Sequence, residues 1–306
     1  MKSMHVLLRN AVDYAGLFPP AGLDMGTAVN NFATYLAGED SWALGRFIVP
    51  VSRLDEFARA AAPLLSSIST ERTWNLAALS AADLGADLAV IENFNSRYAA
   101  SGPIPVMIDT VERRAGSVDD VRETMHRIPA HLQAYLELPV DRDPAPLLQC
   151  LAGSTVRGKV RTGGVTADAF PSPADLLRFI EAAVQAKVPF KATAGLHHPL
   201  RSDYRLTYAP DSARGRMFGF LNVFLTAAWL HSGRDRREAL ELLEEGSPAA
   251  IQIDDGGIGW RDFRLGLPEI GRARREAIIA FGSCSFTEPI GELQTLNFLE
   301  PRVSQA

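Results

Sequence analysis

The stretch VRGKVRTGGVTADAFPSPADLLRFIEAAVQAKVPFKATAGLHHP, residues 156–199, decides the fold. Its apolar and turn pattern predicts a strand that ends at residues 159–164, a helix over residues 172–187 and a second strand over residues 190–194. Two strands separated by a helix of this length are typical of a unit in which the strands lie parallel and side by side. The stretch therefore indicates an α/β fold with a parallel sheet.

The same alternation of strand and helix runs along most of the 306-residue chain. Eight strand candidates without a break in composition favour one (β/α)8 TIM barrel over residues 1–306 rather than a doubly wound sheet. The other six strands are expected within residues 13–20, 46–51, 73–79, 104–109, 134–138 and 277–281. Helices are expected at residues 25–36, 54–65, 81–99, 143–151, 268–276 and 288–299, with one more beginning near Ser117 and Asp119.

Residues 196–263 depart from this alternation and are predicted to form an insertion between the seventh and eighth strands. The insertion holds an apolar helix at residues 217–230 and a charged helix at residues 234–245. A strong turn signal, DDGG, indicates a hairpin or a lid at residues 250–263. The apolar helix fits either the core or a subunit contact, so a homo-oligomer is one expectation.

Composition narrows the class of protein. A formal net charge of −5 argues against partners such as nucleic acid or an anionic membrane surface. The apolar runs are too short to span a bilayer, and the first residues do not resemble a signal peptide. The two cysteines, far apart in sequence, fit reduced thiols. We therefore expect a cytoplasmic protein that acts on a small molecule.

Lysine is scarce in this chain. The 31 basic residues include only four lysines, and two of these, Lys159 and Lys191, lie near the carboxyl ends of the neighbouring strands described above. An arginine cannot lose its proton at a useful pH, whereas a buried lysine can. By the period-two rule, Lys159 shares a face with Arg161. If that face points inward, mutual repulsion lowers the lysine pKa, and a free amine can attack a carbonyl group to form an imine. Alternatively, the lysines point outward or pair with Glu137 as ordinary ions.

Three short motifs resemble those of class I deoxyribose-phosphate aldolases. They are Lys-X-X-Thr-Gly at the end of the sixth strand, Lys-Ala-X-X-Gly at the end of the seventh, and Gly-Ser-X-Ser after the last. The resemblance implies that Lys159 is the Schiff-base lysine and that Lys191 lowers its pKa. It also implies that Gly282, Ser283 and Ser285 hold a substrate phosphate. Asp109 and Glu137, at the ends of the fourth and fifth strands, are candidates by position for moving protons.

Other groups near the strand ends suit an anionic ligand. Arg161 can pair bidentately with a phosphate or carboxylate. Backbone N–H groups of glycine-rich turns can also bind an anion, although such turns often have no role beyond the tight bend. The residues concerned are Thr162, Gly163 and Gly164 after the sixth strand, and Gly282, Ser283, Cys284 and Ser285 after the eighth. Cys284 is as readily explained as a small buried side chain.

The adjacent His197 and His198 offer a second kind of chemistry. Histidines beyond a strand end can bind zinc or another divalent metal, with Glu137, Asp109, Asp254 or Asp255 as oxygen donors. Without a metal, the same histidines could move protons.

The leading hypothesis is an aldolase-like lyase that needs no cofactor. It would form a lysine imine with a small carbonyl compound bearing a phosphate or carboxylate. A metal-dependent lyase, isomerase or hydrolase centred on the two histidines is the alternative enzyme. A non-catalytic barrel that binds a metabolite is the third hypothesis.

Overall fold

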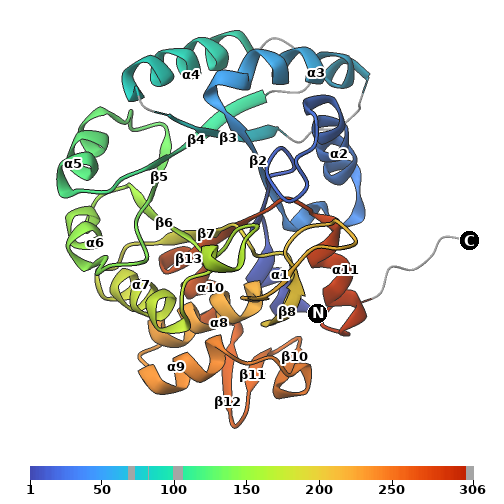
Figure 1. The fold of residues 1–306 in the computed structure, drawn as a ribbon, viewed down its shortest axis with the longest axis vertical. Helices are drawn as coiled ribbons and strands as arrows, with labels where there is room; N and C mark the ends of the chain where they lie inside the picture. Colours follow the sequence, from blue (N-terminus) through green and yellow to red (C-terminus); the bar gives the residue numbers. More distant parts are fainter. Residues whose placement is uncertain (68–72, 82, 99–105, 301–306) are drawn as a thin grey trace, which may run out of the picture.

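The computed structural model describes residues 1–67, 73–81, 83–98 and 106–300. Within this part of the chain, eight parallel strands close into a barrel in the order β1-β13-β7-β6-β5-β4-β3-β2, surrounded by helices (Figure 1). The protein is therefore a (β/α)8 TIM barrel, as its sequence predicts. The strands are β1 (Val12–Tyr14), β2 (Leu44–Pro50), β3 (Trp74–Leu79), β4 (Val106–Arg114), β5 (Gln133–Glu137), β6 (Arg157–Arg161), β7 (Phe190–Thr193) and β13 (Ile278–Ser283).

The surrounding helices begin where the sequence offers capping side chains. Asp24 accepts a hydrogen bond from the backbone N–H of Thr27, Ser117 forms a capping box with Asp120, and Ser172 precedes a proline at the first helical position. The helices are α2 (Met25–Ala37), α3 (Leu54–Ser67), α4 (Leu84–Tyr98), α5 (Val118–Arg127), α6 (Ala145–Leu151), α7 (Pro173–Gln185), α8 (Phe220–His231) and α11 (Thr287–Thr295). Short 3-10 turns lie at Glu39–Ala43, Val51–Arg53, Ala167–Ala169 and Pro248–Ala250.

The hydrophobic core lies between the barrel and the helices. Phe47 and Trp74 on β2 and β3 pack their rings against Phe32 of α2 and Phe57 of α3. On the opposite side, the Phe220 ring of α8 stacks on Phe281 of β13, with ring centroids 4.8 Å apart. The outward strand faces therefore bury large apolar and aromatic side chains against the helices.

Strand β4 differs from its prediction in a way that matters for the site. The sequence argument ended this strand at Asp109, but it continues to Arg114. Its pairing with β3 shifts register after Ile108, so that Thr110 pairs with Ala77. The first residues of the predicted strand, 104 and 105, lie outside the described residues. The carboxyl end of β4 therefore lies five residues further along the chain than expected.

The insertion between β7 and β13 contributes to both ends of the barrel. The hairpin of β8 (Ser202–Arg205) and β9 (Arg214–Met217) follows the carboxyl end of β7. The remaining elements are α8, α9 (Arg236–Leu243), the antiparallel sheet of β10 (Ile251–Asp254), β11 (Gly257–Trp260) and β12 (Phe263–Gly266), and α10 (Leu267–Glu276).

The sheet of β10, β11 and β12 lies at the amino-terminal end of the barrel. It packs beside α1 (Lys2–Leu8), which leads into the start of β1. The Ser3 hydroxyl donates a hydrogen bond to the Asp254 carbonyl oxygen, and the Lys2 N–H donates to the Asp255 side chain. The hairpin predicted at residues 250–263 is present. The alternative prediction, that this segment forms a lid over the mouth of the barrel, is wrong, because the hairpin lies at the amino-terminal end. Helix α8, buried from Phe220 to Trp229, belongs to the core of the chain.

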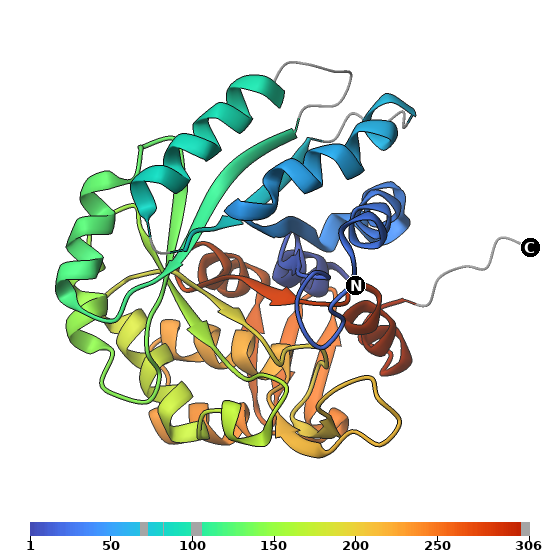
Figure 2. The ribbon, with the colours of Figure 1, turned by 45° about the horizontal axis from the view of Figure 1, so that its top comes forward.

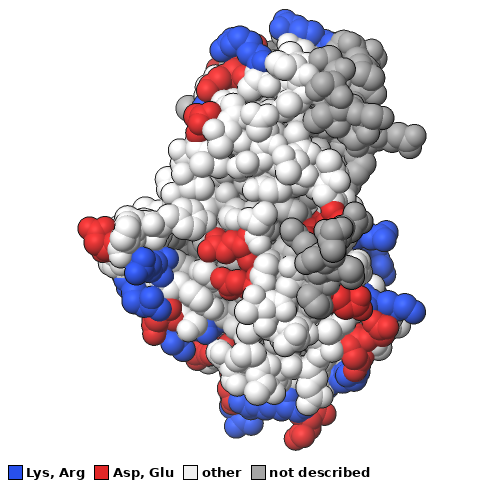
Figure 3. All heavy atoms as spheres, turned by 90° about the vertical axis from the view of Figure 1, so that its right-hand side faces the viewer, with Lys and Arg blue, Asp and Glu red and all other residues white. Residues whose placement is uncertain are grey.

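The surface is mixed in charge. On the face drawn in Figure 3, the right-hand side of Figure 1, most acidic and basic side chains lie towards the edges, and one acidic group lies near the centre. Figure 2 shows the helices enclosing the barrel strands from a second direction. Within the described ranges, the helices are too short or too polar to cross a lipid bilayer.

Candidate active site

A cavity of about 600 Å³ opens at the carboxyl-terminal mouth of the barrel. This is the end at which TIM-barrel enzymes place their active sites. The predicted residues that line it are Glu137, Lys159, Arg161, Gly164, His197, Gly282 and Cys284. The sequence argument did not identify Glu112, Arg113 and Arg114, which line it from the extended end of β4.

The two lysines lie opposite each other on neighbouring strands, as predicted. Lys159 of β6 and Lys191 of β7 are paired in the sheet register, and both point into the barrel. Lys159 lines the cavity and its side chain is 7% exposed. Lys191 lies below the cavity and is fully buried. Only Lys159 is therefore in reach of a bound molecule.

Glu112 bridges the two ammonium groups from β4. Its Oε1 accepts a hydrogen bond from Lys191 Nζ at 2.6 Å, and its Oε2 lies 2.8 Å from Lys159 Nζ in an ion pair. Burial by itself would raise the pKa of Glu112, but the positive charges of Lys159 and Lys191 lower it to about 2. Glu112 is therefore ionised at neutral pH, and its negative charge separates the two cations.

The environment of Lys191 is the reverse of the one predicted. Its Nζ also donates to Asp13 of β1, so this lysine has two carboxylate partners. Burial would lower the pKa of Lys191, but the negative charges of Asp13 and Glu112 outweigh that effect and raise it above its ordinary value. Mutual repulsion between the lysines therefore does not lower the pKa of Lys191, which stays protonated.

Asp109 is not at the mouth, contrary to the prediction. It lies earlier on β4 and forms a bidentate ion pair with Arg46 of β2, with Nε–Oδ1 and Nη2–Oδ2 distances of 2.6 and 2.8 Å. The backbone N–H of Arg46 in turn donates to Asp13 at 2.8 Å. Asp109 does not line the cavity, and its carboxylate is occupied by a guanidinium group. The extra length of β4 explains the error, because it moves Glu112 to the depth assigned to Asp109.

Glu137 completes the row of alternating charges at the cavity wall. Its Oε2 lies 3.0 Å from Lys159 Nζ, and its Oε1 contacts the Nε atoms of Arg114 and Arg161 at 3.2 and 3.3 Å. Burial would raise the pKa of Glu137, whereas Lys159 and Arg161 lower it, and the net shift is downward. Both arginines line cavities at this rim. An anionic group of a ligand would therefore find two guanidinium groups within reach of Lys159.

The turn after β6 is largely structural. The Thr162 hydroxyl donates to the Ala194 carbonyl oxygen at 2.6 Å, which ties the ends of β6 and β7 together. A Cβ on Gly163 would lie 2.3 Å from a ring carbon of Phe170, so this glycine makes room for an aromatic ring. Thr162 and Gly163 do not line the cavity, and only Gly164 keeps its predicted position there.

In the turn after β13, too, some of the predicted residues line the cavity and others do not. Gly282 and Cys284 line the cavity. The Ser283 hydroxyl instead lies 3.1 Å from Nδ1 of His197, and the Ser285 hydroxyl accepts the Glu288 N–H at the start of α11. The side chains of Ser283 and Ser285 are therefore engaged by the protein itself.

The two histidines point to different places. His197 lines the lysine cavity, and burial lowers its pKa to about 4, so the imidazole is neutral at pH 7. Its ring nitrogens lie 3.7 and 3.9 Å from the Cys284 sulfur, and burial raises the pKa of that thiol. His198 is turned away, with its ring stacked on Tyr204 at 3.5 Å.

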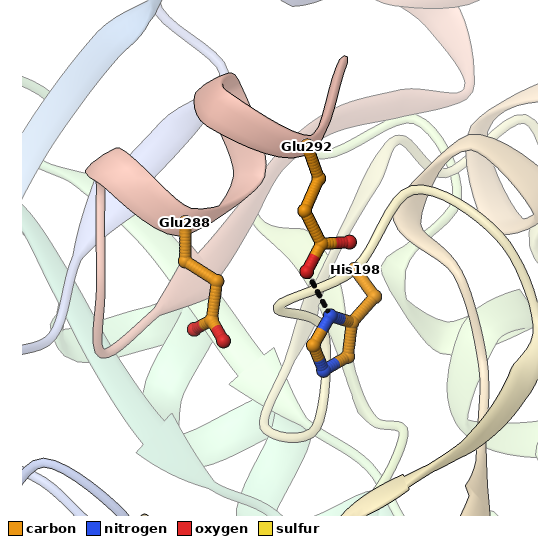
Figure 4. Close-up of side chains that lie close together, drawn as sticks. All are labelled: His198, Glu288 and Glu292. Atoms are coloured by element: carbon orange, nitrogen blue, oxygen red, sulfur yellow. Dashed lines mark hydrogen bonds and ion pairs between the residues drawn. The ribbon is translucent and has the colours of Figure 1, made fainter. Parts of the chain in front are cut away.

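The oxygen atoms near His198 are not those expected for a metal. Its Nδ1 lies 2.6 Å from Oε1 of Glu292, with Glu288 alongside on the same helix (Figure 4). Asp254 and Asp255 lie beside α1 at the opposite end of the barrel. Glu137 and Asp109 are held by the lysine and arginine contacts described above. None of the four acids expected as metal ligands therefore lies beside His198 in the described part of the chain.

Comparison with known families and with curated proteins finds no match for this chain. The function is therefore inferred from the geometry of the cavity. It combines one accessible lysine, two carboxylates in contact with it, and arginines at the rim.

Proposed function

We propose that this chain is an aldolase-like lyase in which Lys159 forms an imine with a small carbonyl compound bearing a phosphate or carboxylate. The observation that supports this most directly is the position of Lys159 Nζ, in the cavity wall and within 3.0 Å of both Glu112 and Glu137. A lysine between two carboxylates has both a proton acceptor and a counter-ion for the charged imine.

The first half of the reaction forms the imine. The Lys159 ammonium passes a proton to the Glu137 carboxylate, and the free amine attacks the carbonyl carbon. The carbinolamine loses its hydroxyl group as water, taking back the proton from Glu137. The resulting iminium ion keeps one positive charge, which replaces that of the ammonium group between Glu112 and Glu137.

The second half breaks a carbon–carbon bond. Glu137 accepts the proton of the β-hydroxyl group, the bond between the α and β carbons breaks, and its electron pair moves into the iminium to give a neutral enamine. Protonation of the enamine and hydrolysis then release the second product and the free lysine. An isomerisation would use the same enamine with proton transfer in place of bond cleavage.

Glu112 and Lys191 have a different task in this scheme. Glu112 is fully buried and in contact with both lysines, which suits a permanent counter-ion better than a proton carrier. Lys191 and Asp13 hold Glu112 in place from below. Arg161 and Arg114 would bind the anionic group of the substrate, because guanidinium groups match the geometry of phosphate and carboxylate oxygens.

The test is to trap the imine by borohydride reduction. The purified protein is incubated with a panel of small aldehydes, ketones and sugar phosphates, reduced, and measured by intact mass and peptide mapping. We expect one adduct per chain, on Lys159, which is lost in Lys159→Arg and retained in Lys187→Arg, a matched variant of an exposed lysine. Glu137→Gln should slow adduct formation.

The outcomes separate the hypotheses. An adduct on Lys159 also gives the mass of the reacting compound. A protein that gives no adduct with any compound, or the same adduct in Lys159→Arg, contradicts the proposal. Tight binding of an anion without any adduct would instead support a metabolite-binding barrel.

A further inference from the structure

A second group of chemically active side chains lies beside the lysine cavity. His198, Glu288 and Glu292 each offer a ligand atom, and these atoms all lie within 4.8 Å of one another. Figure 4 shows the two carboxylates descending from α11 towards the imidazole, which comes from the facing loop after β7. Donor atoms bound to one zinc ion lie roughly 3 to 4 Å apart, so small side-chain rotations would suffice.

The negative charges of the two glutamates favour the binding of a cation. Glu288 and Glu292 are four residues apart, so their side chains share one face of α11, where like charges destabilise a helix. Among the described residues, neither glutamate forms an ion pair with a lysine or arginine.

The surroundings hold the three side chains in place without filling the space between them and solvent. The Tyr204 ring stacks on His198, and the Tyr208 hydroxyl donates a hydrogen bond to Glu288 at 2.9 Å. A separate cavity of about 260 Å³ is lined by His198, Glu288 and both tyrosines. It would leave room for water or a ligand at the remaining coordination positions, the arrangement found in catalytic metal sites.

His197 connects this group of side chains to the lysine cavity. Its side chain is only 7% exposed, it lines both cavities, and its Nδ1 lies 3.8 Å from Oε2 of Glu288. It therefore lies between the lysine cavity and this group of side chains.

We propose that His198, Glu288 and Glu292 bind a divalent transition-metal cation such as zinc, next to the lysine cavity. A donor set with an imidazole nitrogen and two carboxylates suits zinc, manganese or cobalt, whereas calcium takes oxygen donors alone. The cation takes the place of the hydrogen bond between His198 Nδ1 and Glu292 Oε1, and His197 becomes its nearest neighbour on the side of the lysine cavity.

The test is metal binding by the full chain after chelation and dialysis. Zn²⁺ is titrated by calorimetry and Co²⁺ by its visible absorption, in wild type, His198→Asn and Glu292→Gln. Glu276→Gln is the matched control, because Glu276 forms a comparable pair with His231, with an Nε2–Oε2 distance of 3.2 Å. Thermal unfolding of each apoprotein establishes that the variants are folded.

We expect one Zn²⁺ or Co²⁺ per wild-type chain, binding at least about tenfold weaker in both site variants, and no change in Glu276→Gln. Lack of saturable binding by the wild type, or equal binding by folded site variants, overturns the proposal. Lys159→Arg should bind the metal normally, and borohydride trapping is repeated on the metal-free protein. The metal site and the imine can therefore fail independently.

Discussion

Replacing Glu112 by Gln tests the charge network on which the site depends. The variant keeps the shape of the side chain but removes the negative charge that bridges Lys159 and Lys191. The pKa of Glu112 lies at about 2, against an ordinary value of 4.5. Each pKa unit corresponds to about 1.4 kcal/mol, so the net stabilisation of the ionised form, after the cost of burial, comes to about 3 kcal/mol. Removal of one partner from a buried ion pair typically costs about 3 to 5 kcal/mol, because the other charge is left buried.

Urea unfolding of wild type and Glu112→Gln at several pH values measures this loss. The folded-state pKa is depressed, so the stabilisation is complete above the unfolded value near 4.5 and is lost as the pH falls towards 2. We expect a gap of about 3 kcal/mol at pH 7 that narrows below pH 4.5. Glu123→Gln is the control, since Glu123 pairs with Arg127 on the surface, where such pairs contribute about 0.5 kcal/mol.

A Glu112→Gln protein as stable as the wild type at pH 7 would refute the reasoning, because Glu112 would then not be ionised between the lysines. A gap that stayed constant down to pH 3 would also refute it. That result would mean that the loss came from altered packing rather than from charge.

Two further outcomes are expected from the same structure. Arg161→Gln should raise the substrate concentration needed for half-maximal borohydride trapping about tenfold or more, because a hydrogen bond to a charged group contributes about 1.5 to 3 kcal/mol. The control is Arg122→Gln, at an exposed position of α5. An unchanged concentration in Arg161→Gln would show that Arg161 does not bind the anionic group. In an NMR titration, His197 should stay largely unprotonated between pH 8 and pH 5, since its pKa is lowered to about 4. Because that pKa is depressed in the folded state, the protein should lose about 2 kcal/mol of stability between pH 7 and pH 5, and His197→Asn should not show this loss. A titration midpoint near 6.5 would contradict the lowered pKa.

The alternation of strands and helices could be predicted because its signals are local. Apolar spacing, capping residues such as Ser117 and Ser172, and turn residues act over a few positions of the chain. The placement of Lys159 and Lys191 side by side at one edge followed from local rules, since side chains alternate along a strand and neighbouring parallel strands end at one edge. These rules left open whether the two side chains point inward, and the structure shows that both do.

Of the partners of those lysines, the sequence offered Glu137, which pairs with Lys159, but not Glu112 or Asp13. Glu112 was missed because β4 continues to Arg114 instead of ending at Asp109, and those last residues are held by pairing with β3 and β5. The segment TVERR, residues 110–114, was the signal that could have identified Glu112, since a glutamate in an apolar strand needs a cationic partner. The grouping of His198 with Glu288 and Glu292 likewise depends on α11 lying against the loop after β7 (Figure 4).

The charges that surround Lys191 show most clearly what the sequence could not predict and what the fold decided. Two cations side by side suggest repulsion and a lowered pKa, and the residue types along β6 and β7 contain nothing to correct that view. Closure of the barrel between β1 and β13 brings Asp13 to Lys191, 178 residues away along the chain. Coulomb energies depend on distance through space and on burial. Local sequence therefore decided the barrel and the placement of its two lysines side by side, whereas only the closed barrel decided that Lys191 meets two carboxylates.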